Sequence, residues 1–165
     1  MDDTDLALLD ALQQDSSLSY ERIGRKLGLS KTAVWSRVQR LQRDKVIRGQ
    51  VALLDADQIG VGETAFVAIR TAQHSEEWLK RFSAVVAETP EIVEAHRMAG
   101  EIDYLLKVRI ANTRDFDRFY RGLIRKIDLY NVTSTFSMET MKATTALPIR
   151  RADAAGAARE EETAG

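Results

Sequence analysis

The stretch LSYERIGRKLGLSKTAVWSRVQRL, residues 18–41, decides the fold of the N-terminal part of the chain. Ser19 and Ser30 are each placed to cap the start of a helix, and the leucine before each serine can pack against an apolar residue one turn into that helix. Gly28 is placed to end the first of the two helices. Two short helices joined by a Gly-Leu-Ser turn predict a helix-turn-helix.

A further helix is expected before this stretch, with Thr4 as its N-cap and leucines recurring at helical spacing behind it. In the second helix of the motif, Val34, Val38 and Leu41 form one apolar stripe. In a helix-turn-helix this second helix enters the major groove of DNA. A helical hairpin that never contacts DNA has the same spacing, so the motif needs support from charge.

Charge is divided unevenly along the chain, although the formal net charge is only -1. Residues 1–19 contain five acids and no Lys or Arg, whereas residues 20–50 contain nine Lys or Arg and two acids, a local net charge of +7. A concentrated cationic segment predicts a polyanionic partner, although a solvated basic face is the simpler alternative. Together with the helix-turn-helix, it favours double-stranded DNA.

The polar face of the second helix supplies the candidate DNA contacts. From side-chain reach, we expect Lys31, Thr32, Ser36 and Gln39 to approach bases, and Arg37, Arg40 and Lys45 to hold phosphates. Two side chains have alternatives: Arg37 can instead brace the acids of the first helix, and Trp35 can stack on sugars or pack against a protein partner.

The second half of the chain predicts an α+β module of strand, helix, strand, strand, helix and strand, which is a ferredoxin-like βαββαβ unit with both helices on one face of the sheet. The other face needs a cover, so we expect self-association through the sheet. The expected strands are residues 64–72, 91–98, 102–111 and 132–141, with helices that begin after Ser75 and at Thr113.

The expected domains are a winged helix-turn-helix at 1–49, a linking strand and turn at 50–60, a ferredoxin-like module at 61–149 and a flexible tail at 150–165. The 165 residues contain no cysteine and only two histidines, so we expect no metal site and no cofactor. No apolar run is long enough to span a bilayer, and the start has no basic signal region. We therefore expect a cytoplasmic protein without a membrane partner.

Several motifs together resemble the leucine-responsive/asparagine-synthase regulator (Lrp/AsnC) family of transcription regulators. The resemblance spans residues 2–149 and is carried by residues 2–13, 23–30, 34–41, 46–49, 97–108 and 142–148. It implies a winged helix-turn-helix, a linking strand and an effector module that dimerises through its sheet, often forming octamers. The stretch 142–148 resembles the family's closing strand. Lys45 departs from the pattern, because the family commonly has a glycine there that permits positive φ.

The resemblance also implies an effector, usually an amino acid or a related small metabolite. Gly100 and Glu101 lie in a loop where the backbone can approach a ligand, and Asp103 supplies a charge opposite to an ammonium group. By resemblance, Thr133 and Thr135 complete the pocket across a subunit boundary. The alternatives are that residues 100–103 are only a hairpin turn in which Asp103 bonds its own backbone, and that no effector exists.

Two other functions compete with DNA binding. Some proteins of this architecture resemble haem-precursor decarboxylases, and His96 with Arg97 is a weak similarity to their histidine- and arginine-rich stretch. No catalytic constellation accompanies these two residues, so we expect no enzyme. An RNA-binding module requires exposed aromatic side chains on the central strands, for which Phe66, Tyr104 and Phe136 are candidates.

Overall fold

The computed structural model describes residues 1–73 and 75–149, so His74 and the expected tail at 150–165 lie outside the described residues. The chain divides into two compact units. The N-terminal unit contains Met1–Ala52 and the described residues from Lys142 onward, and the sheet unit contains Leu53–Met141. By their contacts, residues 142–149 group with the helices of the N-terminal unit.

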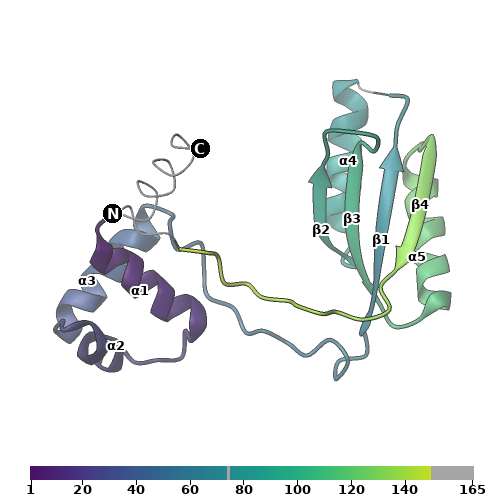
Figure 1. Ribbon diagram of the computed structural model, residues 1–165. Coiled ribbons are helices and arrows are strands. Elements are labelled where there is room, and N and C mark those ends of the chain that lie inside the picture. The colour runs from purple at the N-terminus through teal and green to yellow at the C-terminus, as the bar shows by residue number, and fades with distance from the viewer. Residues whose placement is uncertain (74, 150–165) are drawn as a thin grey trace, which may run out of the picture. The chain divides into compact units, whose positions relative to one another are not determined.

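The N-terminal unit contains three helices, α1 at Asp3–Gln14, α2 at Tyr20–Leu27 and α3 at Lys31–Arg43 (Figure 1). Each helix contributes its apolar stripe to one small core. The buried members of this core are Leu8, Leu12, Ile23, Val34, Val38 and Leu41. The apolar stripe predicted for α3 is therefore confirmed.

The caps of α2 and α3 are confirmed. The hydroxyl of Ser19 accepts a hydrogen bond from the backbone N–H of Arg22, and that of Ser30 accepts one from Ala33, at 3.3 and 3.1 Å. Gly28 ends α2 in the left-handed conformation, with φ of 69°. Because a residue with a Cβ is disfavoured there, the glycine fixes the turn between the two helices.

The predicted cap of α1 was wrong, because the helix begins after Asp2 and not after Thr4. The Asp2 carboxylate accepts from the backbone N–H of Asp5 at 2.7 Å, and the Asp5 carboxylate accepts from the backbone N–H of Asp2 at 3.0 Å. This reciprocal capping box satisfies two backbone donors, whereas Thr4, which has Ala7 three residues later, could satisfy only one.

The segment expected to link the two domains forms no helix or strand within the described residues. The described residues 46–62 form turns and extended backbone but pair with no strand, so neither the wing nor the linking strand at 50–60 is formed. An isolated extended segment has no neighbour to which its N–H and C=O groups can bond. Its side chains Val51, Leu53 and Leu54 are exposed.

The sheet unit has the predicted β-α-β-β-α-β order. The elements are β1 at Glu63–Arg70, α4 at Glu76–Glu88, β2 at Ile92–Arg97, β3 at Tyr104–Ile110, α5 at Thr113–Lys126 and β4 at Asn131–Phe136. All pairings in its sheet are antiparallel, and the strand order is β2-β3-β1-β4.

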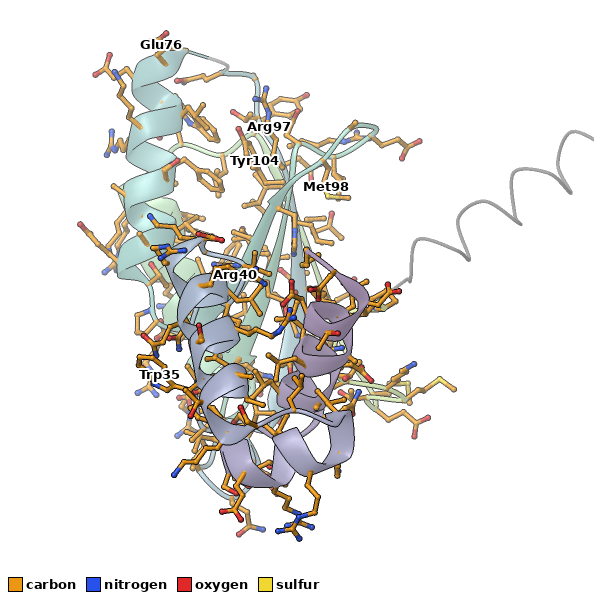
Figure 2. All side chains as sticks on the ribbon, turned by 90° about the vertical axis from the view of Figure 1, so that its left-hand side faces the viewer. Trp35, Arg40, Glu76, Arg97, Met98 and Tyr104 are labelled. Atoms are coloured by element: carbon orange, nitrogen blue, oxygen red, sulfur yellow. The ribbon has the colours of Figure 1, made fainter. Side chains whose placement is uncertain are left out.

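Both helices cover one face of this sheet, as predicted. Alternate residues of β1 and β3 pack against α4 and α5. Tyr104 lies among them, with its ring tilted against those of Trp78 and Phe82 of α4 (Figure 2). Within the described residues of this unit, no helix covers the other face, which we call the open face. It carries Phe66 and Arg70 of β1, Leu105 and Lys107 of β3, and Thr133 and Thr135 of β4.

The closing strand predicted at 142–148 is not formed, and β4 ends at Phe136, five residues before the predicted end at Met141. The chain instead returns to α1. The side-chain amide of Gln13 donates to the carbonyl of Leu147 and accepts from its backbone N–H, both at 2.9 Å. The side-chain amide of Gln13 thus satisfies both the N–H and the C=O of Leu147. These two backbone groups need no neighbouring strand as a partner.

Candidate nucleic-acid interface and ligand site

The outward face of α3 is polar and cationic. The predicted base-contacting residues Lys31, Thr32, Ser36 and Gln39 are all exposed, and the structure brings them together on this one helix. The first turn of α3 contains no acid. No acid of α3 therefore repels a polyanion, and the hydroxyl, amide and ammonium groups of this face can bond base edges. The side-chain amide of Gln39 donates to the side-chain oxygen of Gln42 at 3.3 Å.

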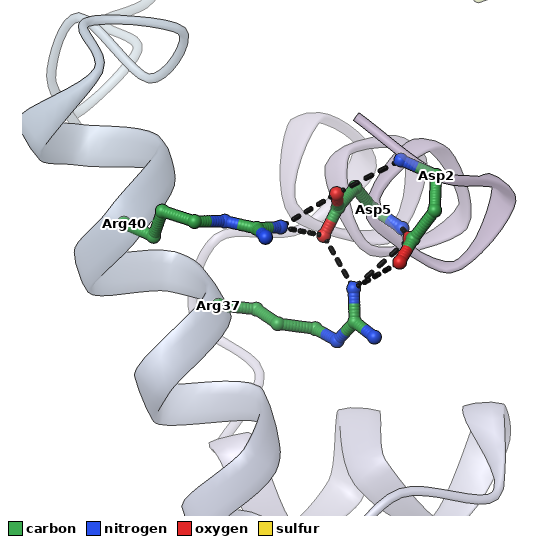
Figure 3. Close-up of polar contacts among 4 residues, drawn as sticks. All are labelled: Asp2, Asp5, Arg37 and Arg40. Atoms are coloured by element: carbon green, nitrogen blue, oxygen red, sulfur yellow. Dashed lines mark hydrogen bonds and ion pairs between the residues drawn. The ribbon is translucent and has the colours of Figure 1, made fainter.

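Arg37 and Arg40 lie elsewhere, on the flank of α3 that faces α1 (Figure 3). Arg37 Nη1 lies 2.7 Å from carboxylate oxygens of both Asp2 and Asp5, and Arg40 Nη2 lies 2.6 Å from both oxygens of Asp5. Bracing of the acids was the stated alternative for Arg37. A bracing role was not expected for Arg40. Arg40 follows Arg37 by one helical turn, and it therefore lies on the same flank of α3.

Asp5 is the buried centre of this cluster, with 1% of its surface exposed. Burial raises the pKa of its carboxyl, but the backbone N–H of Asp2 and the Arg37 guanidinium outweigh burial, so the pKa lies below its ordinary value. The hydrogen bond from Arg37 likewise lowers the pKa of Asp2. Both carboxylates are thus charged at neutral pH, and α3 is fixed against α1 through its arginines.

Lys45 takes the conformation that a glycine was expected to supply. Its φ is 56°, and it is the only non-glycine residue with positive φ among those that the structure describes. The backbone N–H groups of Val46 and Ile47 then bond the carbonyl of Leu41, at 2.9 and 3.1 Å. The side chain of Lys45 is exposed just beyond the end of α3.

The predicted effector loop connects β2 and β3 beside the end of β1. Gly100 has φ of 144°, and the loop is closed by a hydrogen bond of 2.8 Å from the backbone N–H of Met98 to the carbonyl of Asp103. The Asp103 carboxylate accepts from the backbone N–H of Thr71 at 2.8 Å, and the Arg70 side chain bonds the carbonyl of Glu101. Asp103 therefore fastens the hairpin to β1 and does not bond its own backbone.

The two threonines lie on the far side of β1 from that loop. Thr133 pairs with Ala68 and Thr135 with Phe66, and both threonines are exposed on the open face. Within the described residues, the hydrogen bonds of the loop reach β1 but neither threonine. Within one chain, the predicted effector residues therefore lie at two separate locations. One is the loop with Gly100, Glu101 and Asp103, and the other is β4 with Thr133 and Thr135.

Sequence reasoning missed Arg70 and Thr71, which hold the loop, because no local pattern marks a strand end that meets a loop thirty residues later. A cavity of about 190 Å³ opens at the start of α4, but none of the predicted effector residues lines it. Its lining is Gln73, Ser75, Glu77, Trp78, Arg81, Ile127 and Asp128.

The enzyme and RNA alternatives receive no structural support. His96 is exposed on β2 and lies 3.5 Å from Glu94, whose carboxylate is bonded by Lys107 at 2.7 Å. Of the aromatic candidates for RNA, Tyr104 is buried, Phe136 packs edge-on against Phe116 of α5, and only Phe66 lies on the open face. In the described part of the chain, no helix is long and apolar enough to cross a membrane.

Residues 1–42 match the AsnC-type helix-turn-helix domain, and residues 64–147 match the Lrp/AsnC ligand binding domain. The chain belongs to the Lrp/AsnC family. The DNA-binding transcriptional activator DecR of Escherichia coli (strain K12) is 47% identical over 90% of this chain and 99% of its own length. The resemblance read from the sequence motifs is therefore confirmed.

Solved structures of Lrp/AsnC regulators share the fold. An AsnC family transcriptional regulator from Agrobacterium tumefaciens is 49% identical, with a TM-score of 0.87 over 90% of this chain and 97% of that one. A transcriptional regulator from Neisseria meningitidis in complex with L-Met is 26% identical, with a TM-score of 0.85 over 90% and 96% of the two chains. This Lrp/AsnC chain is a DNA-binding transcriptional regulator.

Proposed function

We propose that this Lrp/AsnC regulator binds double-stranded DNA through the outward face of α3. Lys31, Thr32, Ser36 and Gln39 approach base edges, and Lys45 holds a phosphate beyond the end of the helix. The observation that carries this assignment is the exposed, acid-free polar face opposite a fully buried apolar stripe. For Arg37 and Arg40 we propose a bracing role in place of the expected phosphate contacts, and their ion pairs with Asp2 and Asp5 support it.

We also propose that the open face of the sheet joins two copies of the chain. Phe66 is 38% exposed at the centre of this face, and Leu105 lies on the same face of the adjacent strand. A two-fold dimer presents two recognition helices, so we expect a pseudo-palindromic site whose half-sites lie about one helical turn, or a multiple of it, apart. Dimers can assemble further into an octamer.

An amino acid or related metabolite is proposed to modulate assembly or DNA affinity. The L-Met complex of the Neisseria meningitidis relative supports this class of ligand. We place the ligand at the loop of Gly100, Glu101 and Asp103, with Thr133 and Thr135 contributed by a second subunit. Because the structure separates these two sets within one chain, the pocket depends on assembly, and a ligand that bridges the subunits favours the assembled state.

The test combines three measurements on the full chain. Duplexes selected from a random library should bind with a symmetric consensus, light scattering should give an even number of subunits, and Phe66→Glu should lower the measured mass because it buries a charge in the interface. An asymmetric consensus with a monomeric mass and tight binding would contradict the assembly. A failure to enrich any duplex would contradict DNA binding itself.

A further inference from the structure

Trp35 is the one residue of α3 whose character does not match its position. It is 52% exposed on a helix whose other outward residues are polar or cationic, and it is not part of the core of the N-terminal unit. Trp78, in contrast, is 6% exposed and donates its indole N–H to the carbonyl of Asp128 at 3.1 Å. Among the described hydrogen bonds, none comes from the indole of Trp35.

The position of Trp35 around α3 defines where its side chain can reach. Successive residues of a helix are rotated by about 100°, so Trp35 lies nearly opposite Arg37, on the flank away from α1. Figure 2 shows Trp35 on that side of α3, with Arg40 on the side of α1. The outermost face between the two flanks carries Thr32, Ser36 and Gln39.

The dimensions of the major groove then place Trp35 at the groove wall. An α-helix with its side chains is about 10–12 Å wide, and the groove is about 12 Å wide. When the outermost face of the helix points at the bases, a side chain on its flank meets the sugars and phosphates that line the groove. The indole of Trp35 therefore points away from the base edges, whereas it can reach a deoxyribose of the groove wall.

The neighbours of Trp35 favour DNA over a protein partner. The exposed residues one turn away on the same side are Lys31, Thr32 and Gln39, and no acid lies in the first turn. An aromatic anchor at a protein interface is surrounded by other apolar groups at its desolvated core. Here it is surrounded by a cation, a hydroxyl and an amide, which suits an anionic backbone with apolar sugars.

We propose that the indole of Trp35 packs against a deoxyribose of the groove wall and donates its N–H to the adjacent phosphate. The contact is sequence-independent and carries no charge. It rests on the proposed DNA-binding function and assigns a residue to affinity rather than to specificity. Trp35 therefore adds to the binding of every duplex, in contrast to Ser36 and Gln39, whose groups face the bases.

Fluorescence isolates this contact because Trp35 and Trp78 are the only two tryptophans in the chain. In the Trp78→Phe protein, titration with a selected duplex should quench or shift the emission of Trp35, and a scrambled duplex of equal length should do the same at higher concentration. Thermal melting of Trp78→Phe checks that the sheet unit stays folded. An unchanged emission spectrum at saturating DNA would overturn the contact.

Binding measurements separate the wall contact from its rivals. Trp35→Ala should weaken binding to the selected and scrambled duplexes by the same factor, about tenfold, without changing the salt slope, because the indole is uncharged. Trp35→Phe should recover part of the loss. Lys45→Ala, which removes the proposed phosphate contact beyond the end of α3, is the control, and it should lower the salt slope by about one.

Three results would overturn the proposal while leaving DNA binding intact. They are unchanged affinity of Trp35→Ala, a loss confined to one base position, and a loss of assembly mass with normal DNA affinity per dimer. Replacing single thymines by deoxyuridine should leave the effect of Trp35→Ala unchanged, since a contact to the thymine methyl is not part of the proposal. If the wild-type protein enriched no duplex, the proposed function would fail first.

Discussion

Arg40 donates to both carboxylate oxygens of Asp5 through one nitrogen, Nη2, at 2.6 Å each, although the two residues lie on different helices. Asp5 also accepts from Arg37, so one buried carboxylate binds two arginines of the recognition helix. A buried charge without partners is expensive, and removal of one partner from a buried pair costs several kcal/mol. Asp5 therefore sets the position of α3 on α1.

Asp5→Asn should destabilise the N-terminal unit by about 2 kcal/mol at pH 7, because the amide keeps the shape but loses the charge that binds Arg37 and Arg40. The emission of Trp35 in a Trp78→Phe background reports the melting of this unit alone. Asp10→Asn on the exposed side of α1 is the matched control. Equal melting temperatures for both variants would contradict a structural role for Asp5.

The same cluster predicts acid sensitivity. The folded-state pKa values of Asp2 and Asp5 lie below the ordinary value of 3.8. Their contribution to stability is therefore complete above the ordinary pKa and is lost as pH falls through the folded-state values. Unfolding followed from pH 7 to pH 2 should show this loss below about pH 4, and it should be smaller in Asp5→Asn. If the difference in unfolding free energy between Asp5→Asn and the wild type stayed constant from pH 7 to pH 2, the link between these carboxylates and acid sensitivity would be refuted.

Arg37→Ala tests whether this arginine braces the fold or holds a phosphate. Because its guanidinium is bonded to Asp2 and Asp5, we expect a lower melting temperature and a salt slope of DNA binding that stays the same. Lys45→Ala is the comparison and should lower the slope by about one. A slope that falls by one in Arg37→Ala would restore the original phosphate assignment.

Lys45→Gly should raise the melting temperature of the N-terminal unit. A non-glycine residue in the left-handed region costs about 1 kcal/mol, and a glycine at φ of 56° avoids that strain. The gain is expected even though the unfolded chain becomes more flexible. Lys45→Ala keeps the strain and removes the charge, so it should not raise the melting temperature. Equal stability of the Gly and Ala variants would show that the conformation is unstrained.

Asp103→Asn separates ligand binding from loop structure, because an asparagine oxygen can still accept from the backbone N–H of Thr71. A thermal-shift screen of the twenty amino acids identifies the probe, and calorimetry then gives its affinity. We expect Asp103→Asn and Thr135→Val each to weaken binding about tenfold, through a lost charge and a lost hydroxyl. Unchanged affinity in a folded, still oligomeric Asp103→Asn would move the site elsewhere.

The local features of the fold could be predicted from the sequence. The caps at Ser19 and Ser30 and the end of α2 at Gly28 depend on groups within a few residues, so the sequence contains all of the relevant chemistry. The alternation of β3 and its burial on one face are equally local. The cap of α1 could also have been predicted, since Asp2 and Asp5 have the spacing of a capping box, whereas Thr4 has no acceptor side chain three residues later.

The sequence by itself determined the order of elements, the polar face of α3 and the family. The tertiary structure alone decided which charges meet, because the crossing of α1 and α3 brings Asp5 to Arg40 across 35 residues, and the return of the chain brings Leu147 to Gln13 across 134. It also decided that Asp103 fastens its hairpin to Thr71. Contacts between distant residues depend on how the helices and strands pack, and no short-range pattern encodes that packing.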